Sequence, residues 1–264
     1  MNTLPALRTV QVQRYVMPLR EGGSLPGLAE ADDGFLYVLK FRGAGQGVKA
    51  LIAELLGGAL ARIGEIPIPE LVFVQLDEAF GRTEPDEEIQ DLLQASTGLN
   101  LGLHYLSGSI TYDIAVVQPD ALLASKIVWL DAFIFNVDRT ARNPNMLYWN
   151  SDLWLIDHGA SLFFHHNWEG REAYITKPFI QIKDHVLLPY ATRLPEADLW
   201  FRERLTPTVL EALTALIPEG WLHWPETTET PDEIRAFYTR FFTERLAHSS
   251  SFVNAADHAR LSSL

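Results

Sequence analysis

Three polar side chains in one short stretch of the chain could together perform phosphoryl transfer. Asp138 is followed five residues later by Asn143, and Asp157 lies two positions before Gly159. Phosphoryl transfer needs a carboxylate that orients the attacking hydroxyl and accepts its proton. It also needs an amide oxygen and a second carboxylate that hold Mg²⁺ against the phosphates. We therefore expect Asp138 to be the catalytic base, and Asn143 and Asp157 to be the metal ligands.

The elements around these residues must bring them together from separate parts of the backbone. A helix expected over 119–135 leads into a loop over 136–144. The apolar runs 146–149 and 153–156 then predict a hairpin that ends at Asp157. An Asp-then-Asn pair or an Asp-x-Gly alone is usually only a turn. The ordered combination of helix, loop and hairpin with these side chains is the arrangement found in protein kinases.

The amino-terminal part contains a lysine that a kinase could use to hold phosphates. Residues 35–41 predict a β-strand, with Lys40 on the face expected to point inward. A charge there is costly without a partner, although a lysine near a strand end can also reach solvent. A helix expected over 48–62 carries Glu54, which could be that partner or could lie on a solvated face. Because kinases pair the strand lysine with a helix glutamate, we predict that Lys40 binds phosphates and pairs with Glu54.

A glycine-rich segment precedes this strand. Residues 20–34 are rich in Gly, Asp and Pro, so we predict a loop and a turn without regular structure. Gly23 and Ser24 lie in this loop and are predicted to cover the phosphates. The segment does not follow the GxGxxG pattern, so this prediction depends on its position in the chain alone.

The whole pattern predicts an α+β, two-lobed, protein-kinase-like fold. Residues 1–106 are expected to form a strand-rich N-lobe that binds nucleotide phosphates, with further strands over 66–77 and 99–106. Residues 107–264 are expected to form a mainly helical C-lobe with the catalytic loop, the hairpin and the metal site. Its last helix is expected to open at Thr230, which begins the spacing of a capping box.

The composition limits the possible partners and the compartment. The formal net charge of −13 repels polyanions and argues against nucleic acid as a direct partner. A bound nucleotide would need local cations and a divalent metal. The absence of cysteine favours a reducing compartment. The amino terminus does not read as a signal peptide, and Lys126 and Asp131 interrupt the apolar stretch 121–137. We therefore expect a cytoplasmic protein that does not bind a membrane.

The histidines are expected to be structural or on the surface. They show no HExxH or other metal-ligand spacing, so no metal site other than the magnesium site is implied. The positions considered are His104, His158, His165, His166 and His185.

The chain also resembles the HipA-like kinases, in particular the short forms that lack an additional amino-terminal subdomain. The resemblance is carried by SLPGLAEADDGFLYVLKFRGAGQG (24–47), FNVDRTARNPNMLYW (135–149) and LWLIDHGASLFFHH (153–166). The middle segment is the most specific of the three. Its Asp-Arg start also looks like the catalytic loop of phosphatidylinositol kinases, but their following histidine is Thr140 here, which argues against lipid kinase chemistry.

The resemblance implies an atypical Ser/Thr protein kinase that binds ATP and Mg²⁺ in a cleft, with the residue roles given above. It implies that segment 101–106 is the hinge, which contacts adenine through its backbone at Leu103 and Tyr105. It also implies that Ser24 lies in the loop whose serine is autophosphorylated in the family's toxin. That toxin works with a DNA-binding antitoxin, but no residue of this chain marks an interface for one.

The identity of the phosphoryl acceptor stays open. A Ser or Thr of a protein is the leading expectation, and a small-molecule kinase acting on an antibiotic or metabolite is the main alternative. A flat surface beyond Asp138 would favour a protein, whereas a closed pocket lined by carboxylates would favour a polycationic small molecule. A third alternative is a non-catalytic nucleotide-binding regulator. The presence of all three core residues argues against it.

Overall fold

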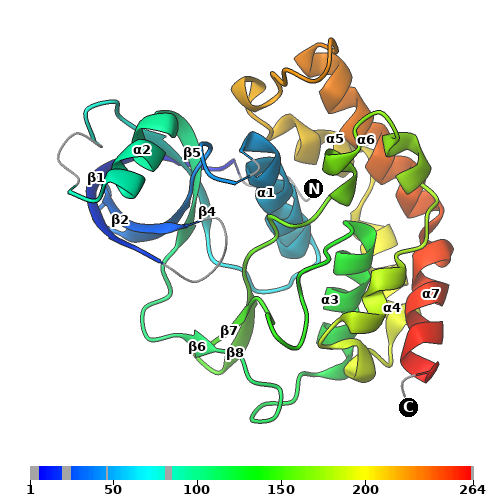
Figure 1. The fold of residues 1–264 in the computed structure, drawn as a ribbon. Helices are drawn as coiled ribbons and strands as arrows, with labels where there is room; N and C mark the ends of the chain where they lie inside the picture. The colour runs from blue at the N-terminus through cyan, green and yellow to red at the C-terminus, as the bar shows by residue number, and fades with distance from the viewer. Residues whose placement is uncertain (1–5, 20–24, 46, 81–84, 263–264) are drawn as a thin grey trace.

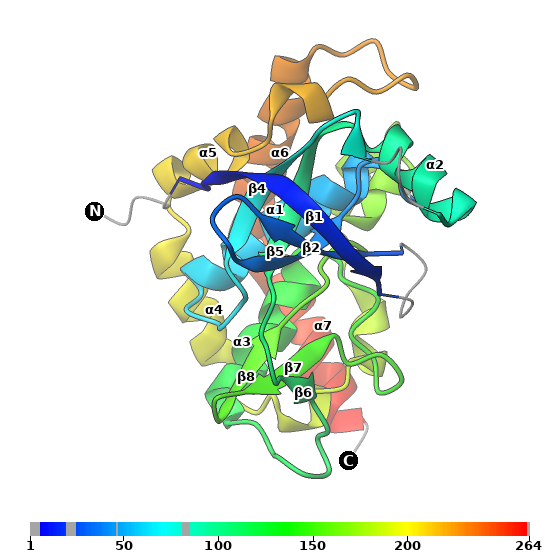
Figure 2. The ribbon, with the colours of Figure 1, turned by 90° about the vertical axis from the view of Figure 1, so that its left-hand side faces the viewer.

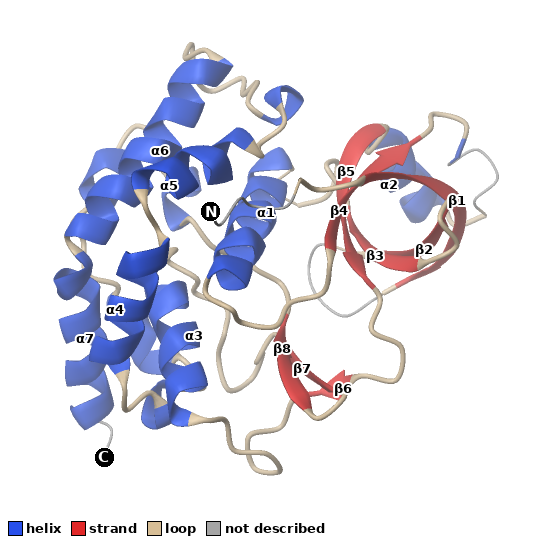
Figure 3. Cartoon of the chain, turned by 180° about the vertical axis from the view of Figure 1, so that it is seen from behind, coloured by secondary structure: helices blue, strands red, loops and turns tan. Residues whose placement is uncertain are grey.

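The chain combines a β-barrel with a larger, mainly helical part. The computed structural model describes residues 6–19, 25–45, 47–80 and 85–262. The barrel lies on one side of the molecule and most helices lie on the other (Figures 1 and 3). The barrel strands are β1 (Thr9–Pro18), β2 (Gly27–Ala31), β3 (Leu36–Lys40), β4 (Leu71–Leu76) and β5 (Gly98–His104).

The five strands close in the order β1-β2-β3-β5-β4. All neighbouring strands are antiparallel except β1 and β4, which are parallel and close the barrel. Strand β5 therefore lies between β3 and β4, and Lys40 at the end of β3 pairs with Leu101 of β5. Alternate side chains of these strands fill a separate apolar core, which includes Val12, Leu39 and Val74. The barrel faces the viewer in Figure 2.

The expectation that residues 20–34 lack regular structure is wrong for part of this segment. Residues Gly27–Ala31 form β2, which pairs with both β1 and β3. Its sequence, GLAEA, lacks the β-branched and aromatic residues typical of strands, and neighbouring side chains leave no room for a larger residue at Gly27. A Cβ at Gly27 would lie 2.5 Å from Tyr15 Cε2. Strand β1 was also not anticipated from the sequence.

Two helices accompany the barrel strands in the chain. The predicted principal helix is confirmed as α1 (Val48–Ile63), and the shorter α2 (Glu87–Ala95) follows β4. Helix α1 is buried from Leu51 to Ala61 and lies between the barrel and the carboxyl-terminal helices (Figure 1). It contacts α3 and α5 as well as β5. A helix in this place can hold residues from both parts of the chain in one arrangement.

The second part contains a small sheet and five longer helices among the described residues. Strands β7 and β8 form the predicted hairpin, and β6 pairs with β7. The capping box is confirmed, because Thr230 and Glu233 cap each other's backbone at the start of α6. Two helices follow instead of one, since α6 ends before His248. The elements are β6 (Ile110–Thr111), α3 (Ala121–Phe133), β7 (Met146–Trp149), β8 (Asp152–Leu155), α4 (Leu194–Arg204), α5 (Pro207–Ala215), α6 (Pro231–Ala247) and α7 (Ser249–Ser262), with short 3₁₀ turns between β8 and α4 and before α6.

The connection between the two parts runs from β5 to β6. The predicted boundary after residue 106 falls in this connection and stays a prediction. In the part of the chain that the structure describes, no helix has the length and apolar character needed to cross a membrane.

Candidate active site

Lys40, Glu54 and Asp157 meet from three separate elements. Lys40 Nζ lies 2.8 Å from Asp157 Oδ1 and 3.8 Å from Glu54 Oε2. Lys40 comes from the end of β3, Glu54 from the middle of α1, and Asp157 from just after β8. The predicted pairing of Lys40 with Glu54 is therefore present as an ion pair, with Asp157 as a second and nearer partner. Glu54 is buried, whereas 38% of the Asp157 side chain is exposed.

The charges of this cluster depend on one another. Burial alone would lower the pKa of Lys40, but Glu54 and Asp157 raise it above its ordinary value, and Asp138 adds a smaller contribution. Burial would likewise raise the pKa of Glu54, but Lys40 and hydrogen bonds from His158 hold it below its ordinary value. Both groups therefore stay charged near neutral pH. The contribution from Asp138 places it within electrostatic reach of Lys40.

Asp138 is held by two amide side chains of its own loop. Asn143 Nδ2 donates to Asp138 Oδ2 at 2.9 Å, and Asn145 Nδ2 donates to the same oxygen at 3.1 Å. The backbone amide of Thr140 donates to the backbone oxygen of Asn143 at 3.0 Å, which closes the loop. The sequence analysis anticipated Asn143 but not Asn145. The two amides orient the carboxylate from one side.

The side-chain oxygens that remain available at Asn143 and Asp157 suit a divalent cation. Asn143 uses its amide nitrogen on Asp138, which leaves its side-chain oxygen available. Asp157 uses Oδ1 on Lys40, which leaves Oδ2 available. Across the described ranges no group of three or more His, Cys, Asp or Glu could hold a metal ion. One carboxylate and one amide oxygen suit Mg²⁺, which usually takes few protein ligands and fills its shell with waters and phosphate oxygens.

The segment after β8 packs directly on α1. Asp157 has a φ of +57°, and the next amide, that of His158, donates to Glu54 Oε2 at 2.9 Å. The His158 side chain lies on Gly57, where an added Cβ would be 2.6 Å from His158 Cβ. His158 is buried and fits the structural role expected for the histidines. Gly57 in the helix interior, unfavourable for helix formation, is explained by this close approach.

Gly57→Ala is therefore expected to reduce phosphoryl transfer about tenfold with little loss of folded protein. The new methyl group would meet His158 Cβ, which can move only with its backbone, so Asp157 would shift away from Lys40. The clash would lower the stability of the folded protein. The better helix propensity of Ala, about 1 kcal/mol, would offset part of this loss. Initial rates and thermal unfolding of the purified variant measure the two effects.

Gly58→Ala is the matched control for this substitution. Its Cβ would meet Leu71 Cδ1 at 2.7 Å, which is the end of a flexible side chain that can rotate away. We expect Gly58→Ala to keep activity within about twofold, because a rotamer change costs roughly 1 kcal/mol or less. Equal activities of the two variants would show that the contact between Gly57 and His158 does not position Asp157.

The predicted hinge is hydrogen-bonded into the sheet of the barrel. Leu103 pairs with Val38 on β3 and with Leu71 on β4. The amide of Tyr105 donates to the Leu36 oxygen at 2.8 Å, so the N–H of Tyr105 is already used within the sheet. A backbone N–H donated to adenine would have to come from beyond this ladder, where Leu106 is the next residue. The other predicted cofactor contacts, Gly23 and Ser24, lie outside the described residues.

Sequence reasoning missed a buried network behind the catalytic loop. Arg139 and Asp131 form an ion pair in which both side chains are fully buried. His185 Nε2 lies 2.9 Å from the same Asp131 oxygen. The available signal was Asp131 itself, a carboxylate within an otherwise apolar helix. A charge in that position requires a buried partner, and Arg139 directly follows the predicted catalytic residue Asp138.

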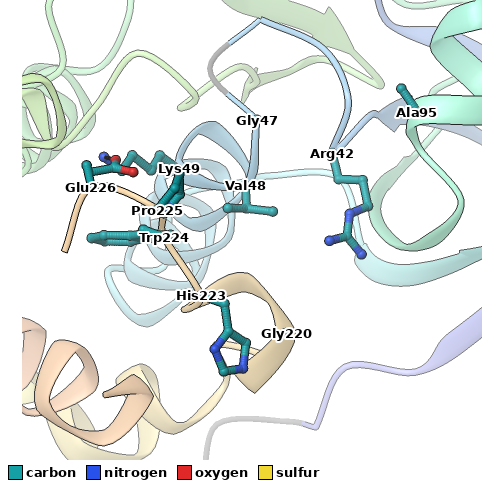
Figure 4. A pocket seen from close by; sticks show the side chains of 10 residues that line it. All are labelled: Arg42, Gly47, Val48, Lys49, Ala95, Gly220, His223, Trp224, Pro225 and Glu226. Carbon is teal, nitrogen blue, oxygen red and sulfur yellow. Dashed lines mark hydrogen bonds and ion pairs between the residues drawn. The ribbon is translucent and has the colours of Figure 1, made fainter. Parts of the chain in front are cut away.

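A cavity of about 390 Å³ lies away from these residues, at the start of α1 (Figure 4). Arg42 lines it from just after the end of β3, Lys49 from the first turn of α1, and His223, Trp224 and Glu226 from the segment before α6. Lys49 pairs with Glu226 across it. None of the predicted site residues lines this cavity, so it is separate from the cluster around Asp138 and Asp157.

An ion-paired strand lysine, a loop that carries Asp138 and an Asp-x-Gly after a hairpin are together typical of kinases. A family model described as HipA-like kinase matches residues 12–250, and the chain belongs to this family. The family prediction is confirmed, and with it the prediction of a kinase.

One solved kinase structure supports the fold, and a second has a weaker similarity. The proinflammatory kinase CtkA of Helicobacter pylori is similar with a TM-score of 0.56 and 11% identity, over 98% of this chain and 99% of that one. The Golgi casein kinase with Mn and ADP bound has a TM-score of 0.47 and 12% identity, over 97% of this chain and 75% of that one. No curated protein matches the chain. The likeness to CtkA shows a kinase fold of mixed strands and helices.

Proposed function

We propose that this kinase transfers the γ-phosphoryl group of ATP, with Mg²⁺, to a Ser or Thr hydroxyl of a protein. The observation that carries the proposal is the contact of Lys40 with both Glu54 and Asp157. A lysine held between a helix carboxylate and the carboxylate of an Asp-x-Gly is the arrangement that kinases use on nucleotide phosphates.

Each residue has a distinct proposed role. Lys40 binds the phosphates, and Glu54 holds its ammonium in place from α1. Asn143 and Asp157 would hold Mg²⁺, which neutralises charge on the phosphates when bound. Asp138 orients the acceptor hydroxyl and accepts its proton, since the amides of its own loop already fix one of its oxygens.

The surroundings of Asp138 support a large acceptor. Residues 141–143 of the catalytic loop are exposed and Asp138 itself is half-buried, so one side of this loop is open to solvent. An open face allows a protein segment to approach the carboxylate, whereas a small molecule is usually bound in a concave site that buries most of its surface. The experiment that identifies the acceptor also tests the alternative of a small-molecule kinase.

Transfer to an acceptor is tested with γ-labelled ATP, Mg²⁺ and a cell lysate. We expect label on a discrete protein band, and phosphoserine or phosphothreonine after acid hydrolysis of that band. Label that appears only in a new small-molecule product, distinct from ATP and inorganic phosphate, would replace the protein acceptor by a metabolite. Label that stays on ATP and inorganic phosphate alone, with folded protein present, would contradict phosphoryl transfer to an acceptor.

Nucleotide binding is expected to require a divalent metal. A chain with a net charge of −13 must offset the triphosphate charge locally, and Lys40 is already shared between two carboxylates. Calorimetry should show ATP affinity at least about tenfold weaker in EDTA than in Mg²⁺, consistent with a metal bound largely by phosphate oxygens. The same comparison between Mg²⁺ and EDTA is repeated with ADP in place of ATP. Equal affinity for ATP under both conditions would contradict the metal site.

A further inference from the structure

One arginine of the catalytic loop is completely buried and has partners in three separate segments. The Arg139 side chain is 0% exposed, and its Nε donates to Asp131 Oδ2 at 2.5 Å. Its Nη1 donates to the backbone oxygens of Pro144 at 3.5 Å, Asn145 at 2.5 Å and Ile156 at 3.4 Å. These contacts run from α3, through the end of the catalytic loop, to the end of β8.

Two of these backbone oxygens belong to residues next to the catalytic carboxylates. Asn145 donates its side chain to Asp138, and Ile156 directly precedes Asp157. The Ile156 amide also donates to the Asn145 oxygen at 3.0 Å, so that oxygen accepts from both Arg139 and the hairpin end. Asn145 and Asp157 have φ values of +48° and +57°. Asn and Asp adopt this left-handed region more readily than other non-glycine residues, but it is still less favourable than the α or β region, so the surrounding hydrogen bonds help to hold both residues in it.

The carboxylate that faces Arg139 is itself firmly held. Asp131 accepts from Asn136 Nδ2 at 2.9 Å, and Asn136 Oδ1 accepts from the Asp138 amide at 3.1 Å. Burial alone would raise the pKa of Asp131, but Arg139 and His185 hold it well below its ordinary value. Asp131 is therefore ionised at neutral pH. It forms a fixed point in α3 from which the guanidinium reaches the loop and the hairpin.

We propose that Arg139 is a positioning residue that sets the separation between the catalytic loop and the end of β8. It would thereby set the separation between Asp138 and Asp157. This inference rests on the proposed function, in which those two carboxylates act on the same phosphoryl group. Arg139 reaches neither carboxylate directly in any described contact, so it acts through the backbone that carries them.

Arg139→Lys tests the proposal because it keeps the charge and removes the fork of donors. A single ammonium cannot reach Asp131 and the backbone oxygens of Asn145 and Ile156 together. We expect kcat to fall about 10- to 100-fold and the Mg²⁺ concentration for half-maximal rate to rise by at least about tenfold, the range seen when groups behind metal ligands are changed. Backbone hydrogen exchange should become faster over residues 143–157.

Arg245→Lys is the matched control. The Arg245 side chain is also 0% exposed, and it donates to backbone oxygens of α3 and of residues 174–177, none of them in the catalytic loop or the hairpin. Both variants are expected to lose thermal stability. Only Arg139→Lys should raise the Mg²⁺ requirement and the exchange rate over 143–157, measured at a temperature where both remain folded.

The outcomes separate this inference from the proposed function. A folded Arg139→Lys protein with the Mg²⁺ requirement and exchange pattern of the wild type, or of Arg245→Lys, would overturn the inference. If Arg139→Lys does not fold, Asp131→Asn loosens the same guanidinium and should speed exchange over 143–157; unchanged exchange there would also overturn it. If the wild type transfers no phosphoryl group, the proposed function fails, and hydrogen exchange still decides the role of Arg139.

Discussion

Asp138→Asn is expected to remove most phosphoryl transfer while leaving the affinity for ATP with Mg²⁺ within a few-fold of the wild type. The proposed task of Asp138 is to accept the proton of the acceptor hydroxyl, and that hydroxyl is absent from the complex with nucleotide alone. A positioned base contributes about 10²- to 10⁴-fold to rate, so the loss should be at least about 10²-fold. Asn keeps the size of the side chain and can still contact Asn143 and Asn145.

Single-turnover transfer and calorimetry on the same preparation measure the two quantities. Asp152→Asn is the control, because Asp152 is an exposed carboxylate on the same hairpin that ends at Asp157. It should leave both rate and affinity unchanged. Loss of nucleotide binding in Asp138→Asn would mean that Asp138 helps to hold the nucleotide or its metal. A transfer rate near that of the wild type would remove Asp138 from the role of base.

Short-range patterns predicted much of the fold because their causes are local. The hairpin before Asp157 follows from two apolar runs and a polar turn, and the start of α6 follows from the spacing of Thr230 and Glu233. Strand β2 could not be predicted in this way. Its first residue, Gly27, lies against the side chain of Tyr15 from β1, a contact that local propensity does not contain.

The same distinction applies to the site. The pairing of Lys40 with Glu54 was predictable because an inward lysine on a strand needs a carboxylate. The role of Gly57 was not predictable, because a glycine in a helix looks like a defect until His158 is seen to lie against it. Arg139 and Asp131 are similar, since only the folded chain shows which buried charge meets which. The residue types in the sequence therefore indicate which buried groups need an interaction partner, and the packing of the folded chain decides which residue that partner is.

Asp157→Asn is expected to weaken nucleotide binding as well as transfer, unlike the change at Asp138. Asp157 is the proposed carboxylate ligand of Mg²⁺. In the variant both proposed protein ligands, Asn143 and the changed residue, would be neutral amides. In the free protein, Asp157 Oδ1 is also the nearer partner of Lys40, at 2.8 Å, so Asn would leave Lys40 with Glu54 at 3.8 Å. Both effects act on the groups that meet the phosphates.

The expected result for Asp157→Asn is a loss of at least about tenfold in affinity for ATP with Mg²⁺, and near loss of the difference between Mg²⁺ and EDTA, because loss of an ionised ligand weakens a hard-cation site most. Calorimetry in both conditions measures the difference directly, with Asp152→Asn as the control. Transfer should fall in parallel, since an interaction present in both the bound and the reacting complex affects both. Full metal-dependent binding in Asp157→Asn would mean that the Asp-x-Gly after β8 does not hold the metal. In that case Asp157 would serve chiefly as the partner of Lys40, and Lys40→Met would be expected to reproduce the defect of Asp157→Asn.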